Sequence, residues 1–156
     1  MAESFYVRNG LIAGFIAGVV TAIITYATLP SVDEVIEAAS RYLPEGMRGV
    51  DLEALRPVLS LALKLSGLIG LVVATLLGAI FGWIQEVIDK RIGYRPVVSA
   101  LLAGLILIAL LAGPNIALGA SEVKTMSSMA TGITYTIVLT ALAIKGKNRL
   151  GGSNWQ

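Results

Sequence analysis

The sequence predicts an all-α fold: a polytopic membrane protein with four transmembrane helices and a short amphipathic interfacial helix in the first loop. Hydrophobic residues make up 56% of the 156 residues, charged residues make up 14%, and the mean hydropathy is +0.81. A soluble domain carries roughly 25% charged residues, so this chain has too few charges to cover a water-exposed surface. Four stretches also lack any charge, 9–32, 65–85, 96–121 and 125–144, and a helix of about 20 apolar residues crosses the bilayer core.

The first span is expected at residues 10–29, where Pro30 closes it. The preceding residues 1–9 lack the small-residue cleavage site of a signal peptide. We therefore expect this span to be retained in the mature protein.

The amphipathic helix is expected at residues 31–43. Ser31 and Glu34 have the spacing of a capping box, in which the hydroxyl and the carboxylate each bond an unpaired backbone N–H at the start of a helix. Apolar residues then recur at helical spacing opposite charged ones, which is typical of a helix on the membrane surface. Pro44 and Gly46 are expected to end it.

The second span is expected at residues 65–84. Its helix should begin near Pro57, a residue that suits a first helical turn. It should continue beyond the bilayer to Arg91, because Glu86 and Lys90 form a favourable i,i+4 pair.

The third span is expected at 97–113, stopping at Pro114, and a mobile loop should follow it. The fourth span is expected at 126–144, ahead of a basic and flexible tail. We treat residues 1–156 as a single membrane domain.

The orientation follows from the lysines and arginines, which concentrate on the cytoplasmic side of a membrane. Seven lie on the side of the two termini and five on the other side. We therefore predict a cell-membrane protein with both termini in the cytoplasm and residues 31–57 outside.

Several classes of site are excluded by composition. The chain has no cysteine and no histidine, which removes thiolate and imidazole metal sites, iron–sulfur clusters and a Ser-His-Asp triad. The net charge of +2 is too small to indicate nucleic acid. We expect no enzyme activity and no catalytic residue, cofactor or metal ligand.

Small residues every fourth position in the first two spans predict close helix packing of the glycine-zipper type. Such residues form a flat strip that lets two helix backbones approach. The strip residues are Gly10, Gly14 and Gly18 in the first span and Gly70, Ala74, Gly78 and Gly82 in the second. Packing within the chain, packing between protomers and a glycine-lined conduction pathway remain open.

Hydroxyl groups in the first and fourth spans form a predicted polar seam, because such groups avoid lipid. The seam residues are Thr21, Thr25, Thr28, Thr131, Thr134, Thr136 and Thr140. Either they bond back to carbonyls of their own helix, or they line a path for a small solute or ion.

Ionisable residues are absent from the depth of every predicted span. This argues against an autonomous proton-coupled transporter, which relies on such groups. The outer segment, by contrast, is acidic, with Asp33, Glu34, Glu37, Glu45, Asp51 and Glu53. It is either a solvated surface or a site that gathers divalent cations.

The layout of these segments resembles a known family. The glycine-rich first span ends in Pro30, the acidic segment 32–39 follows, residues 70–84 read GLVVATLLGAIFGWI, and a basic turn leads to a third span that ends in Gly-Pro-Asn. Over most of residues 5–145 this is similar to the CbtA-type integral membrane proteins, proposed subunits of cobalt transport. The resemblance implies a transport role but assigns no metal ligand to this chain.

Two functions therefore remain open. The first is a transport-associated subunit that passes, or helps to pass, an ion or small solute. The second is a structural or accessory subunit of a larger membrane complex. The expected partners are the lipid bilayer and either copies of the chain in a homo-oligomer or other membrane subunits, since four spans enclose little interior volume. An enzyme acting on lipid is a more distant third.

Overall fold

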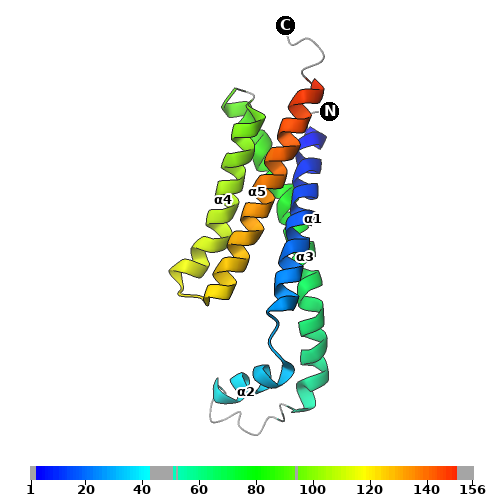
Figure 1. The fold of residues 1–156 in the computed structure, drawn as a ribbon, viewed down its shortest axis with the longest axis vertical. Coiled ribbons are helices and arrows are strands. Elements are labelled where there is room, and N and C mark those ends of the chain that lie inside the picture. The colour runs from blue at the N-terminus through cyan, green and yellow to red at the C-terminus, as the bar shows by residue number, and fades with distance from the viewer. Residues whose placement is uncertain (1–2, 43–50, 52, 94, 151–156) are drawn as a thin grey trace.

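The computed structural model describes residues 3–42, 51, 53–93 and 95–150, and over these it is all-α (Figure 1). The helices are α1 (Glu3–Ala27), α2 (Val32–Tyr42), α3 (Arg56–Arg91), α4 (Pro96–Ala117) and α5 (Glu122–Leu150), with a 3-10 turn η2 (Glu53–Leu55) before α3. Of these, α1, α3, α4 and α5 are long and apolar enough to cross a membrane. The predicted all-α class and the four candidate spans are thus confirmed.

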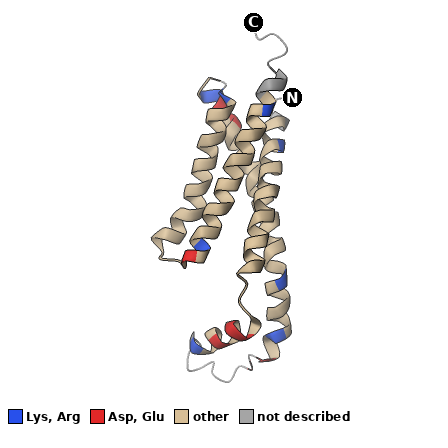
Figure 2. Cartoon of the chain, in the orientation of Figure 1, with Lys and Arg blue, Asp and Glu red and all other residues tan. Residues whose placement is uncertain are grey.

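The four long helices form an antiparallel bundle in which α1 lies along α3 and α5, and α4 lies along α5 and α3 (Figure 1). Both termini lie at one end, together with the turn between α3 and α4; we call this the termini end. The opposite end carries α2 and the turn between α4 and α5, and we call it the α2 end. Charged residues gather at the two ends, and the bundle between them is almost free of charge (Figure 2).

The boundaries of three helices differ from the expected spans. Helix α1 starts at Glu3, α4 continues to Ala117, and α5 runs from Glu122 to Leu150. The expected stop at Pro114 is therefore wrong, and so is the expected flexible tail for residues 145–150. The loop between α4 and α5 is reduced to 118–121.

Pro114 lies inside α4, where its missing backbone N–H leaves one carbonyl, that of Leu110, without its helical donor. The following residue, Asn115, donates its side-chain N–H to the Leu111 carbonyl at 2.9 Å, and the Leu118 N–H donates to the Pro114 carbonyl at 2.9 Å. Helical bonding thus resumes immediately after the proline.

Helix α2 begins with the expected capping box. The Ser31 N–H donates to Glu34 Oε2 at 3.0 Å, and the Glu34 N–H donates to Ser31 Oγ at 3.2 Å. The helix lies beside the first turns of α3, where Arg56 pairs with Asp33 at 2.7 Å. Pro44 and Gly46, expected to end α2, lie outside the described residues.

The packing inside the bundle uses small side chains, whereas large apolar ones point outward. Ala13, Ala17, Ala100 and Ala103 are fully or almost fully buried. Leucine, isoleucine and valine side chains on all four long helices are exposed. This arrangement suits a hydrocarbon solvent, in which helix association depends on close contact rather than on burying large apolar groups.

Candidate functional site

The small-residue strips of α1 and α3 face each other, and most of their members pack backbone against backbone. A Cβ at Gly14 would lie 2.5 Å from the Ala74 carbonyl oxygen and 2.8 Å from Gly78 Cα. A Cβ at Gly10 would likewise lie 2.7 Å from Gly82 Cα. Such distances leave no room for a methyl group, so this pair of helices has a fixed spacing.

Two strip positions are less tight. A Cβ at Gly18 would meet Leu71 Cα at 3.0 Å and Ala74 Cβ at 3.2 Å. At Gly70 the nearest atom is Thr21 Cγ2, at 4.0 Å, which is an ordinary van der Waals distance. The strip therefore opens towards the α2 end.

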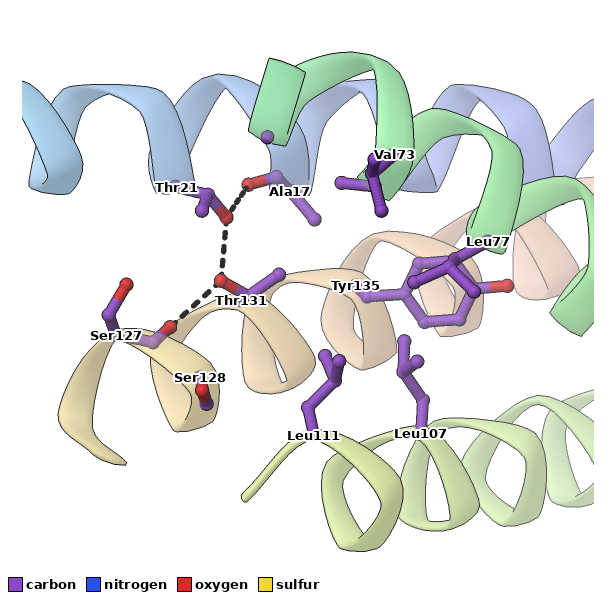
Figure 3. Close-up of a pocket in the computed structure, with 12 residues that line it drawn as sticks. Ala17, Thr21, Val73, Leu77, Leu107, Leu111, Ser127, Ser128, Thr131 and Tyr135 are labelled. Atoms are coloured by element: carbon purple, nitrogen blue, oxygen red, sulfur yellow. Dashed lines mark hydrogen bonds between the residues drawn. The ribbon is translucent and has the colours of Figure 1, made fainter. Parts of the chain in front are cut away.

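A cavity of about 210 Å³ lies where the strip opens, between all four long helices (Figure 3). Its apolar wall includes Leu77, Leu107 and Leu111. Its polar lining residues are Thr21, Ser127, Ser128, Thr131 and Tyr135. The cavity is thus a partly open, mostly apolar space with a few hydroxyl groups in its wall.

The two threonines that meet in the cavity share too few hydrogens for their contacts. Thr21 Oγ1 lies 2.6 Å from Thr131 Oγ1. Each also lies within bonding distance of a carbonyl of its own helix, Thr21 to Ala17 at 2.9 Å and Thr131 to Ser127 at 2.8 Å (Figure 3). Two hydroxyls donate only two hydrogens to these three contacts. One contact is therefore always without its hydrogen, and the pair can change partners easily.

Tyr135 closes the inner end of the cavity. Its side chain is almost fully buried, its hydroxyl donates to the Gly78 carbonyl at 3.1 Å, and its ring packs edge-on against Phe81 with the centroids 6.4 Å apart. This bond joins α5 to the tight part of the α3 strip.

The predicted polar seam is only partly brought together. Thr21 and Thr131 meet, whereas Thr28 and Thr136 donate to carbonyls of their own helices, at 2.8 and 2.7 Å. Thr25 and Thr134 are half-buried. Contacts with carbonyls of the same helix thus occur at four of the seam threonines, including Thr21 and Thr131, and the path for a solute or ion stays a prediction.

Thr140, the last seam residue, lies nearer the termini end. Its hydroxyl oxygen is buried and has no hydrogen-bond partner among the described residues. It does not take part in the cavity.

A second polar cluster lies inside the bundle at the termini end. Asp89 is 1% exposed and accepts hydrogen bonds from the Tyr6 hydroxyl at 2.5 Å and from Ser99 Oγ at 3.2 Å. Gln85 is 2% exposed and donates its amide N–H to the Pro96 carbonyl at 3.1 Å. Side chains of α1, α3 and α4 thus converge around one carboxylate.

Glu86 is the least satisfied member of this cluster. It is 2% exposed, and Lys90 Nζ lies 2.6 Å from its Oε1. Its Oε2 has no hydrogen-bond partner among the described residues. The pair with Lys90 was expected from the i,i+4 spacing, but the burial of the carboxylate was not.

The sequence contained a signal for this cluster. Counting three and four residues onward from Gly82, on the face that packs against α1, gives Gln85 and Glu86, and Asp89 follows one turn later. Extending the strip beyond the expected end of the span would have placed both acids inside the bundle.

Among the described residues, two arginines of the acidic segment at the α2 end pair with three of its acidic side chains. Arg56 pairs with Glu53 at 2.8 Å as well as with Asp33, and Arg41 pairs with Glu37 at 2.5 Å. No group of three or more acidic side chains suited to a metal ion occurs among the described residues. Glu45 lies outside them.

Comparisons with known proteins identify no relative: no family model, curated protein or solved structure matches this chain. The resemblance to the CbtA-type proteins stays a prediction.

Proposed function

We propose that this chain is a multi-pass cell-membrane protein that acts as a transport-associated subunit, passing or helping to pass a small polar solute or an ion. The observation that supports this best is the partly open cavity between the four long helices, whose mostly apolar wall carries hydroxyl groups from α1 and α5. Protein interiors are close-packed, so an open space of this size between four helices is available to a small molecule.

The size and lining of the cavity limit the solute. Since water occupies about 30 Å³ in the liquid, roughly seven waters would fill it, and it is smaller than the roughly 300 Å³ at which drug-sized pockets begin. No charged side chain lines it among the described residues. We therefore favour a neutral polar solute, or an ion held by hydroxyl and carbonyl oxygens.

The proposed orientation places both termini in the cytoplasm, because basic residues concentrate at their end. The cavity, nearer the α2 end, then lies in the outer half of the membrane. A cysteine at Glu37 should react with an impermeant thiol reagent in intact cells, and one at Arg95 should react only after permeabilisation. Reaction of both in intact cells would contradict the orientation.

A second candidate function is that of an accessory subunit without transport activity of its own. It is favoured by the layer of buried side chains between the cavity and the termini end, which includes Ala13, Ala103 and Leu139. These side chains leave no polar path through a single chain. In either role, the proposed partners are lipid and further membrane subunits, as copies of this chain or as other proteins.

Flux into proteoliposomes separates the two functions. We expect vesicles containing the protein to take up urea, glycerol or an alkali cation several-fold faster than protein-free vesicles. Thr131→Val, which removes a cavity hydroxyl at nearly constant volume, should lower that rate. Thr28→Val is the matched control, because this exposed hydroxyl bonds only its own helix. Equal rates with and without protein for every solute would favour the accessory role.

A further inference from the structure

The two buried acids at the termini end, Glu86 and Asp89, share one paired cation among the side chains that the structure describes. Both acids are almost fully buried. The cation is Lys90, which lies against Glu86 and is itself 53% exposed. A buried carboxylate without compensation is strongly unfavourable. A further positive charge beside these acids would therefore be stabilising.

Hydrogen bonding shows where that charge would bind. Asp89 Oδ2 accepts the Tyr6 hydroxyl, and Asp89 Oδ1 lies 3.2 Å from Ser99 Oγ, whose one hydrogen is shared with the Pro96 carbonyl. The oxygens left open are Oε2 of Glu86 and the amide oxygen of Gln85, which have no partner among the described residues. The Gln85 amide lies within the cluster, because the Pro96 carbonyl that it bonds is also bonded by Ser99.

We propose that Glu86 and Gln85, beside Asp89, form a binding site for one alkali ion that enters from the termini end. A single positive charge balances the excess of one carboxylate. Carboxylate and amide oxygens are the hard ligands that such ions take. A divalent ion fits less well, since the described residues bring together no group of three acidic side chains.

Other described groups around the site do not supply this charge inside the bundle. Tyr6 from α1 donates a neutral hydrogen bond, and α4 contributes the Ser99 hydroxyl and the Pro96 carbonyl. The remaining described basic residues of this end are all exposed: Arg8, Arg91, Arg95 and Lys145. Exposed cations are screened by water and act weakly on a buried carboxylate.

This site goes beyond the proposed transport role and does not depend on it. It lies at the other end of the bundle from the cavity, and binding is measured on purified protein without any flux. A chain that binds a cation but passes no solute would retain this inference and lose only the proposed function.

Thermal unfolding in detergent tests whether the site binds an alkali ion. Sodium, potassium or lithium chloride should raise the Tm of the wild type above its value in choline chloride of equal ionic strength, by about 5 °C once the ion reaches about 100 times its Kd. Glu86→Gln should abolish this rise, and Gln85→Leu should weaken it. Glu122→Gln, at an exposed acid of the α2 end, is the matched control and should keep it.

The same Tm for the wild type in sodium, potassium, lithium and choline chloride would overturn the site. A rise that Glu86→Gln keeps in full would overturn it as well, because the ion would then bind elsewhere.

Discussion

The two antiparallel helix pairs of the bundle carry the same small-residue spacing but use it differently. Between α1 and α3, glycine meets glycine, and the atoms that crowd Gly14 and Gly78 belong to the backbone. Between α4 and α5, each glycine receives a side chain from the other helix: Gly104 faces Thr136, and Gly132 faces Ile108. The contact between α1 and α3 is made by main chains, whereas the contact between α4 and α5 is made mainly by side chains that pack against glycines.

This difference shows that spacing alone does not measure how closely two helices are held. A backbone cannot rotate away from an added methyl group, so the helices themselves must move apart. A threonine or isoleucine side chain can change rotamer at a modest energetic cost. We therefore expect α1 and α3 to tolerate substitution far less than α4 and α5.

The largest effect is expected for Gly78→Ala. The added Cβ would lie 2.6 Å from Gly14 Cα and 2.9 Å from Gly14 N, so α1 must shift. Overpacking of this kind destabilises by typically 1–3 kcal/mol, and we expect a value near the upper end, about 3 kcal/mol, measured by reversible unfolding in mixed micelles. A loss as small as that of Gly104→Ala would remove the distinction between the pairs.

An intermediate effect is expected for Gly104→Ala. The new methyl group would meet Oγ1 and Cγ2 of Thr136, which rotation of this side chain can move away. It would also lie 2.7 Å from Thr136 Cβ, which rotation leaves in place, so the two helices must shift slightly as well. Rotation gives up the bond to the Gly132 carbonyl, and losing such a bond costs about 1 kcal/mol. In a Thr136→Ala background the penalty should shrink, and a double-mutant cycle measures that coupling. Equal penalties in the two backgrounds would mean that the backbone, not this side chain, limits the contact.

The smallest effect, of opposite sign, is expected for Gly70→Ala. It belongs to the same strip of α3 as Gly78, but its new methyl group would find only Thr21 Cγ2 at 4.0 Å. Alanine favours a helix over glycine by roughly 0.8–1.0 kcal/mol, so stability should stay level or rise slightly. A clear loss of stability would show that the strip remains tight at this position.

The sequence predicted the elements that depend on local or one-dimensional patterns. Four uncharged stretches gave the four candidate spans, and the capping box of Ser31 and Glu34 located the start of α2. The extension of α3 to Arg91 also follows from local charge spacing. In each case the relevant partners lie within a few residues along the chain.

Features that depend on neighbouring helices were not predicted. Pro114 was expected to stop a helix that in fact continues, with Asn115 bonding a carbonyl of the turn before the proline. The sequence placed Glu86 beyond the bilayer but did not predict that Glu86 and Asp89 are buried, with Asp89 bonded by side chains of α1 and α4. Which threonines of the seam meet depends on helix rotation, which a single sequence does not determine.

Because α3 is long, the thickness of the surrounding membrane affects how this helix sits in it. Its 36 residues extend for about 54 Å, well beyond a hydrocarbon core of roughly 30 Å. Its first turns carry apolar side chains such as Val58 and Leu61, which are 64% and 58% exposed. A thicker bilayer covers them, whereas a thinner one favours a tilted helix. Because Arg56 of α3 pairs with Asp33 of α2, such tilting also moves α2, so hydrophobic mismatch changes how α2 meets the surface.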